Sequence, residues 1–249
     1  MVQIFMSLFS KELKETKIKF LVALLSFLFL GLLGILLIYM LPTLMPPEMV
    51  IPIQYSALEA YQTSIGDILQ IGTLIITLLS MDAIAGERER KTLELLLIKP
   101  TSRFSIIISK FLSRSLIILV AVLGAAIPTW AYTTYLFGEL SLSAVILTAI
   151  IITLLLVFVC SITITYSILV KSQFMAAIGG IVTSAVLASL TMLPEPWNAL
   201  TPFHYGNSSA ILQETIAAAT YLQNSLIIST FVATVMFLNL MIFSKIYIQ

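Results

Sequence analysis

The sequence predicts an all-α, polytopic membrane protein with six transmembrane helices. Of its 249 residues, 59% are hydrophobic and only 10% are charged, which is too little polar content to cover a protein of this size in water. The apolar residues also fall in runs long enough for a helix to cross the hydrocarbon core of a bilayer. We place the six spans at residues 20–41, 65–85, 111–136, 142–170, 174–193 and 226–244.

The charged residues predict the orientation of these spans. Lys and Arg accumulate in the short cytoplasmic loops of inserted proteins. If the N-terminus is inside and the chain crosses six times, all 13 Lys and Arg residues fall on the cytoplasmic side. The charged residues of the outer loops are all acidic: Glu48, Glu59, Glu139, Glu195 and Glu214. We therefore expect one multi-pass domain over residues 1–249, in the lipid bilayer of the cell membrane, with both termini cytoplasmic.

Residues 1–19, before the first span, have an amphipathic pattern. Apolar side chains recur at helical spacing on one face, at Ile4, Phe5, Leu8, Phe9 and Leu13. A helix of this kind lies in the membrane interface, with its apolar face toward the lipid. The alternative is a basic terminus without regular structure that only orients the first span.

The second span begins with a polar stripe. Its members follow one another at three or four residues: Thr63, Asp67, Gln70, Thr73 and Thr77. Because acidic residues in spans usually face a bundle interior or water, this face is our candidate for a translocation path. Asp82, near the cytoplasmic end of the same span, is either solvated or paired with a nearby Arg.

The fifth span carries small residues at a spacing of four, namely Ala176, Gly180, Ser184 and Ala188. This pattern lets helix backbones approach closely in lipid, so we expect a packing seam. Residues 194–224, which follow, contain no basic residue and are too polar for a further crossing. We expect them to form an outer segment that is helical or re-entrant.

The sequence offers no constellation of catalytic residues. His204 is the one histidine, so a zinc site with two histidines is excluded, and no GxxxxGK[ST] loop for a nucleotide phosphate occurs. We expect no enzyme activity, no metal site, no cofactor and no nucleic-acid partner on this chain. If ATP drives the protein, another subunit must bind it.

Residues 86–103, GERERKTLELLLIKPTSR, concentrate charge in an otherwise apolar chain. Glu87–Lys91 and Arg90–Glu94 are opposite-charge pairs at the i, i+4 spacing that stabilises a helix, and Pro100 ends that helix. Thr101 or Ser102 can cap the next one. The leucines Leu93, Leu96 and Leu97 form an apolar patch beside the charges, which suits docking onto a protein partner. The alternative is a solvated loop whose basic residues only orient the chain.

The run GERERKTLELLLIKPTSRFSIIISKFL resembles the segment between the second and third spans of ABC-2 type transporter permeases. Their pattern there is E-R-x-x-x-T-L-E-x-L-L-x-x-P-x-x-R, and many members have Gly where this chain has Lys91. The matching residues are Glu87, Arg88, Thr92, Leu93, Glu94, Leu96, Pro100 and Arg103. The resemblance implies that the short helix, which also includes Arg90, Lys91 and Leu97, is a coupling helix that docks onto a nucleotide-binding subunit.

The same resemblance implies a function. The chain would be the permease subunit of an ATP-driven exporter, paired with a second copy or a related permease. Separate ABC ATPase subunits would bind ATP and Mg²⁺. Two alternatives stay open from the residues alone: an ATP-independent secondary transporter or channel that uses Asp67, and a membrane scaffold without transport activity.

Overall fold

The structure, a computed structural model, describes residues 2–44, 55–93, 102–206, 208–213 and 217–246. Within these residues every regular element is helical, and six helices are long and apolar enough to cross a membrane. The predicted all-α class with six spans is therefore confirmed. The six helices are α2 (Lys17–Leu44), α3 (Ala57–Ser80), α6 (Arg103–Phe137), α7 (Leu142–Leu169), α8 (Gln173–Ser189) and α10 (Ala218–Ile246).

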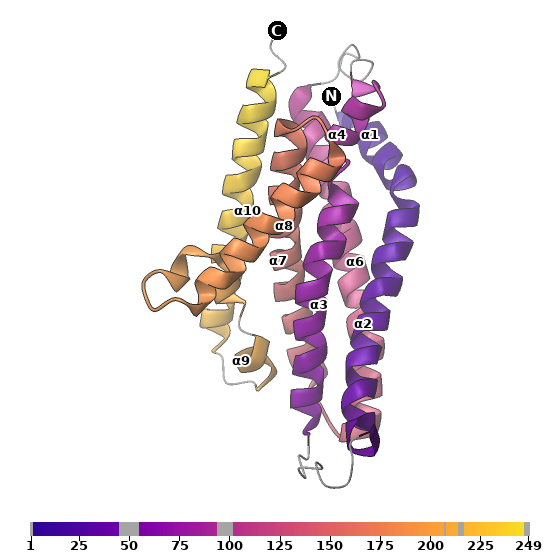
Figure 1. Ribbon diagram of the computed structural model, residues 1–249, viewed down its shortest axis with the longest axis vertical. Helices are drawn as coiled ribbons and strands as arrows, with labels where there is room; N and C mark the ends of the chain where they lie inside the picture. The colour runs from indigo at the N-terminus through magenta and orange to yellow at the C-terminus, as the bar shows by residue number, and fades with distance from the viewer. Residues whose placement is uncertain (1, 45–54, 94–101, 207, 214–216, 247–249) are drawn as a thin grey trace.

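Both chain termini lie at the same end of the bundle (Figure 1), which we call the terminal end. The two shorter helices α1 (Val2–Glu15) and α4 (Ala85–Glu89) lie at this end as well. The connection between α7 and α8 is also here, because α8 begins beside α4. Each span carries the chain from one end of the bundle to the other, so six spans bring both termini to the same end.

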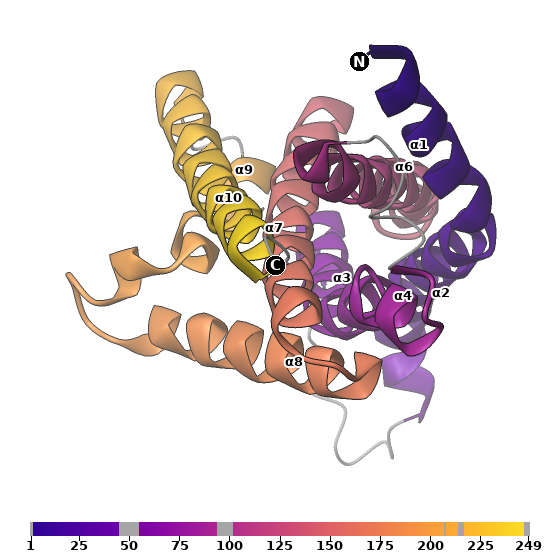
Figure 2. The same cartoon turned by 90° about the horizontal axis from the view of Figure 1, so that it is seen from above.

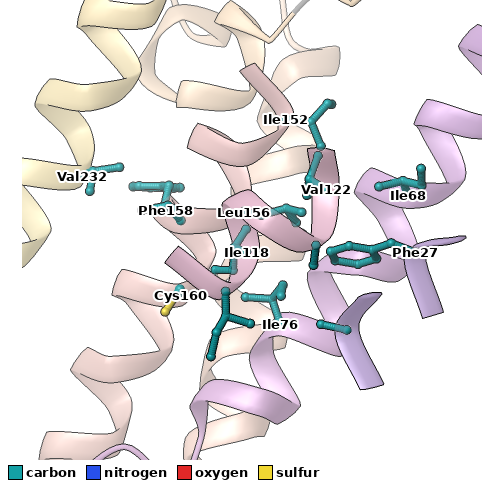
Figure 3. Close-up of a cluster of buried hydrophobic side chains, with 14 of the residues drawn as sticks. Phe27, Ile68, Ile76, Ile118, Val122, Ile152, Leu156, Phe158, Cys160 and Val232 are labelled. Atoms are coloured by element: carbon teal, nitrogen blue, oxygen red, sulfur yellow. The ribbon is translucent and has the colours of Figure 1, made fainter. Parts of the chain in front are cut away.

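α7 is the central helix of the bundle. It packs against α3, α6, α8 and α10, and Figure 2 shows it between them. Its side chains Ile152, Leu156 and Phe158 lie in the main apolar core, which Figure 3 shows together with side chains from the surrounding helices. Lipid tails are as apolar as these side chains, so their burial alone does not hold the helices together.

Hydrogen bonds between helices add to this packing. The Ser64 hydroxyl of α3 donates to the Gly31 carbonyl of α2 at 3.1 Å, and the Asn239 amide of α10 donates to the Ser161 carbonyl of α7 at 3.0 Å. In a membrane such bonds contribute about 0.6 kcal/mol each on average. They fix which faces meet as much as they add stability.

Local capping sets where two of the helices begin. α3 starts before the predicted span because Ser56 and Glu59 form a capping box, in which each side chain bonds the backbone of the other. α6 starts at Arg103 because the Ser102 hydroxyl accepts from the Ser105 amide at 3.1 Å. Ser102 is one of the two caps that the sequence offered.

The segment after α8 folds back against the middle of α7. It contains the short helices η2 (Leu190–Met192), η3 (Asn198–Leu200), η4 (Pro202–Tyr205) and α9 (Ser208–Leu212). Phe203 packs edge-on against Phe158, with ring centroids 6.3 Å apart. A Cβ at Gly206 would lie 2.5 Å from Leu155 Cδ1, so a larger residue here would displace the Leu155 side chain. α8 itself runs obliquely and diverges from α10 (Figure 2).

Candidate functional site

The short helix α4 is joined to α7 at its start. The first amides of any helix lack partners within that helix. Here the buried Ser167 hydroxyl of α7 accepts from the amides of Ile84 and Ala85, both at 2.9 Å, and donates to the Met81 carbonyl at 2.8 Å. Ser167 therefore caps α4 from a neighbouring helix and also fixes the turn that leads into it.

The next three side chains of α4 point to three different helices. Glu87 forms an ion pair with Lys110 of α6 at 3.2 Å. Arg88 donates to the Ile168 carbonyl at 2.9 Å and to the Val170 carbonyl, both at the end of α7. Glu89 accepts from the Gln173 amide at the start of α8, at 2.8 Å. A cation at a helix C-terminus and an acid at an N-terminus both satisfy orphan backbone groups.

α4 ends in a Schellman motif at Lys91. The Thr92 amide donates to the Glu87 carbonyl at 2.9 Å and the Lys91 amide to the Arg88 carbonyl at 3.1 Å. Lys91 has φ of 56°, the left-handed conformation that favours glycine. Glycine, which has no Cβ, would adopt this conformation without strain. The predicted Glu87–Lys91 ion pair is wrong, because the helix ends at Glu89 and Glu87 binds Lys110 instead.

Leu93 requires a second correction. Its side chain is 4% exposed and belongs to the main core of this chain, so it anchors the segment to its own bundle and offers no surface to a partner. By contrast, Arg90 and Lys91 are exposed, and Arg103 begins α6. The other predicted coupling residues, Glu94, Leu96, Leu97 and Pro100, lie outside the described residues.

Six charged side chains form a connected ion-pair network beside α4. Three are acids and three are bases, so the network is neutral, and they come from α1, α2, α4, α6 and the turn after α3. The contacts are Lys110 to Glu12 at 2.7 Å and to Glu87 at 3.2 Å, Arg114 to Glu12 at 3.7 Å and to Asp82 at 3.2 Å, and Lys19 to Asp82 at 2.5 Å. We call these six residues the charge network.

Burial makes the charge network sensitive to loss of any member. The side chains of Lys110 and Glu12 are only 4% and 8% exposed, and a buried charge that loses its partner is strongly unfavourable. Lys110 links α1 to α4, since it bonds an acid of each. The network borders a pocket of about 310 Å³ that Arg90 also lines.

Sequence reasoning missed most of this network. It left Asp82 either solvated or paired with an Arg, and the structure pairs it with Arg114 and Lys19. A signal for Arg114 did exist, because a basic residue inside a predicted span needs an acidic partner. Glu12, Glu15 and Glu87 bring carboxylate oxygens within 4.8 Å of one another, but Lys110 already supplies the positive charge between Glu12 and Glu87.

On α1, Lys11 pairs with Glu15 at 3.2 Å, beyond the edge of the network. Partial burial acts to lower the pKa of Lys11, but the hydrogen bond and the charge of Glu15 outweigh it, so the pKa is raised. This exposed pair stabilises α1 only weakly.

The predicted polar stripe divides between two neighbours. Gln70 and Thr73 line a cavity of about 580 Å³ between α3, α8 and the segment after α8. Asp67 is placed differently: its carboxylate lies against α2, where a Cβ at Gly34 would be 3.1 Å from Asp67 Oδ2. Thr63 is exposed, and Thr77 is fully buried.

The small-residue stripe of α8 faces the bundle over most of its length. Ala176, Gly180 and Ser184 are buried. A Cβ at Gly180 would lie 2.7 Å from the Thr163 hydroxyl of α7 and 2.9 Å from the Thr77 methyl of α3, so α8 approaches both helices here. Further along, Ser184 and Ala188 line the cavity that Gln70 and Thr73 share. The structure thus brings the candidate path and the candidate seam together.

Comparison with known protein families identifies the family of this chain. The family model described as ABC-2 family transporter protein matches residues 3–244. The chain belongs to the ABC-2 transporter family. A search of curated proteins found no match.

Membership of the ABC-2 family makes this chain a membrane transport subunit that is not itself catalytic. It implies association with ABC ATPase subunits in general. The six apolar helices agree with a multi-pass membrane protein. His204, the one histidine of the sequence, lies edge-on to Tyr205, with ring centroids 5.1 Å apart.

Proposed function

We propose that this chain is the permease subunit of an ATP-driven ABC-2 exporter, and that it works as a dimer with a second copy or a related permease. ABC ATPase subunits bind ATP and Mg²⁺, and they dock at the terminal end of the bundle. That end is the cytoplasmic one, because the basic residues of the chain belong to it. The observation that carries this proposal is the position of α4, which is bonded to α6, α7 and α8 at once.

Movement of the ATPase reaches the membrane through α4. The exposed Arg90 and Lys91 contact the ATPase subunit. The side chains that connect α4 to the bundle are Glu87, Arg88 and Glu89. Because Arg88 and Glu89 bond the backbone at the corner of α7 and α8, α4 and this corner move together. The ion pairs with α6 and α1 exchange partners as they do so.

This movement changes the cavity between α3 and α8. α8 has its first residue bonded to α4 and its later turns at the cavity, so a displacement of α4 shifts one wall relative to Gln70 and Thr73. These two residues are the part of the predicted path that we assign to translocation. An ATP-independent transporter would instead use Asp67, whose carboxylate lies toward α2.

Charge reversal at Arg90 and Lys91 tests the proposal. Both side chains are exposed, so the double variant Arg90→Glu, Lys91→Glu should insert and fold normally. It should lose co-purification of the ATPase and the ATP-dependent transport that the parent shows. The matched control is Lys14→Glu, Lys245→Glu, which makes the same charge change at two exposed positions on α1 and α10.

Two results would contradict the proposal. One is full ATPase retention and parental turnover in the Arg90, Lys91 variant. The other is transport by this chain in vesicles that contain no ATPase, which would favour the ATP-independent function.

A further inference from the structure

The cavity between α3 and α8 lies level with the middle of α7 and is open on one side, where its lining residues Leu74 and Met192 are 43% and 89% exposed. Phe203, which closes one side of it, packs against Phe158 of α7, and the neighbouring Gly206 approaches Leu155. Leu155 lies midway along α7, which at 1.5 Å per residue is roughly 20 Å from the first residue of that helix. Since a bilayer has about 30 Å of hydrocarbon, the cavity is at a depth where lipid tails surround the protein.

The cavity walls are apolar with a few uncharged polar groups. Its polar members include Gln70, Thr73, Ser184, Ser189 and Thr191, and none of its lining residues carries a charge. Its volume of about 580 Å³ is within the usual range for sites that bind drug-sized molecules.

Ser184 differs from the other hydroxyl residues of the cavity. Thr73, Ser189 and Thr191 each donate to a carbonyl of their own helical segment at 2.7 Å. The Ser184 hydroxyl is buried and has no hydrogen-bond partner among the described residues. A buried hydroxyl without a partner is unfavourable, so it is a donor available to a ligand.

The surrounding charges limit what such a ligand can carry. None of the described basic residues lines the cavity, so a carboxylate or phosphate would be buried there without a partner. Asp67, the acid closest along α3, has its carboxylate against α2 and does not line the cavity. A cation would therefore also lack a partner.

We infer that the cavity binds an uncharged amphiphile, with an apolar body against Leu74 and Phe203 and a hydroxyl, ester or amide group near Ser184 and Gln70. This inference rests on the proposed function, because it names the substrate class of the same path. It excludes free ions, nucleotides and charged peptides as occupants of this site.

Three photoreactive probes with the same diazirine-bearing dodecyl chain test the inference. Their head groups are an uncharged glycerol ester, a carboxylate and a trimethylammonium. In membrane vesicles that contain the full chain, the glycerol ester should label peptides that include residues 69–74 and 181–192. Each charged probe should label them at least about tenfold less, because its charge has no partner in the cavity.

Two adjacent positions on α8 provide the matched control. Ala185 lines the cavity, whereas Val186 is 54% exposed on another face of the helix. Ala185→Phe should fill the cavity and abolish labelling by the glycerol ester, and Val186→Phe should leave it unchanged. Equal labelling by all three probes, or stronger labelling by a charged one, would overturn the inference. ATPase co-purification, measured on the same vesicles, reports separately on the proposed function.

Discussion

The side of α4 that faces α7 and α8 is held by hydrogen bonds to backbone groups, whereas the side that faces α1, α2 and α6 is held by ion pairs between side chains. Three side chains, Ser167, Arg88 and Glu89, bond amides and carbonyls at helix ends. These hydrogen bonds therefore break only if a helix end moves. Lys110 shares its ammonium between two carboxylates and can shift between them. The hydrogen-bonded side is therefore suited to transmit a displacement of α4 to α7 and α8. The ion-paired side is suited to permit that displacement relative to α1, α2 and α6.

Loss of Lys110 should have the largest effect on stability. Lys110→Met leaves Glu12 and Glu87 without their shared cation in a buried site, which should lower the free energy of unfolding by about 3–5 kcal/mol. Lys110→Arg keeps the charge and should lose far less. The measurement is unfolding of the purified chain in mixed detergent micelles. Equal stability of the Met variant and the parent would mean that the network is solvated.

Removal of the Ser167 hydroxyl tests the hydrogen-bonded side. Ser167→Ala leaves the Ile84 and Ala85 amides without an acceptor, so the free energy of unfolding should fall by about 2–4 kcal/mol. Ser161→Ala is the control on the same helix. Among the described residues this buried hydroxyl bonds only the Phe158 carbonyl of α7, so its loss should lower the free energy of unfolding by less than about 1 kcal/mol. Similar values for the two variants would show that Ser167 does not cap α4.

The smallest change in the free energy of unfolding is expected at Lys91, the residue after the last turn of α4. A lysine in the left-handed region is strained, so Lys91→Gly should raise the free energy of unfolding by up to about 1 kcal/mol. Arg90→Gly, at φ of −79°, has no strain to release and should lower it by about 0.5–1 kcal/mol. A destabilised Lys91→Gly variant would place the end of α4 elsewhere.

The six spans could be predicted from the sequence because lipid requires long uninterrupted apolar runs, and these can be read along the chain. The end of α4 could not be predicted, because lysine does not indicate a left-handed residue at a helix end as glycine does. Leu93 was misassigned because an apolar residue beside charges has the same pattern whether it faces a partner or its own core. The charge network joins residues as far apart as Glu12 and Arg114, a pairing that only the packing of α1 on α6 creates.

The polar stripe of α3 was also only partly predictable from the sequence. A stripe of polar residues at three or four residue spacing identifies one broad face of α3, but it does not say which neighbour each member meets. Asp67 lies slightly to one side of this face and meets α2, whereas Thr73 lies to the other side and meets the cavity. Sequence alone therefore overstated how much of the stripe shares one environment.

In the proposed mechanism, α4 transmits the movement of the ATPase to α8. Spin labels at Ile71 of α3 and Val182 of α8, which are 41% and 54% exposed, report the distance across the cavity in the permease–ATPase complex, with Cys160 replaced by serine. We expect ATP and Mg²⁺ to shift this distance in the parent, and Glu89→Ala to abolish the shift while the ATPase stays bound. An ATP-dependent shift that persists in Glu89→Ala, or no shift in the parent, would contradict it.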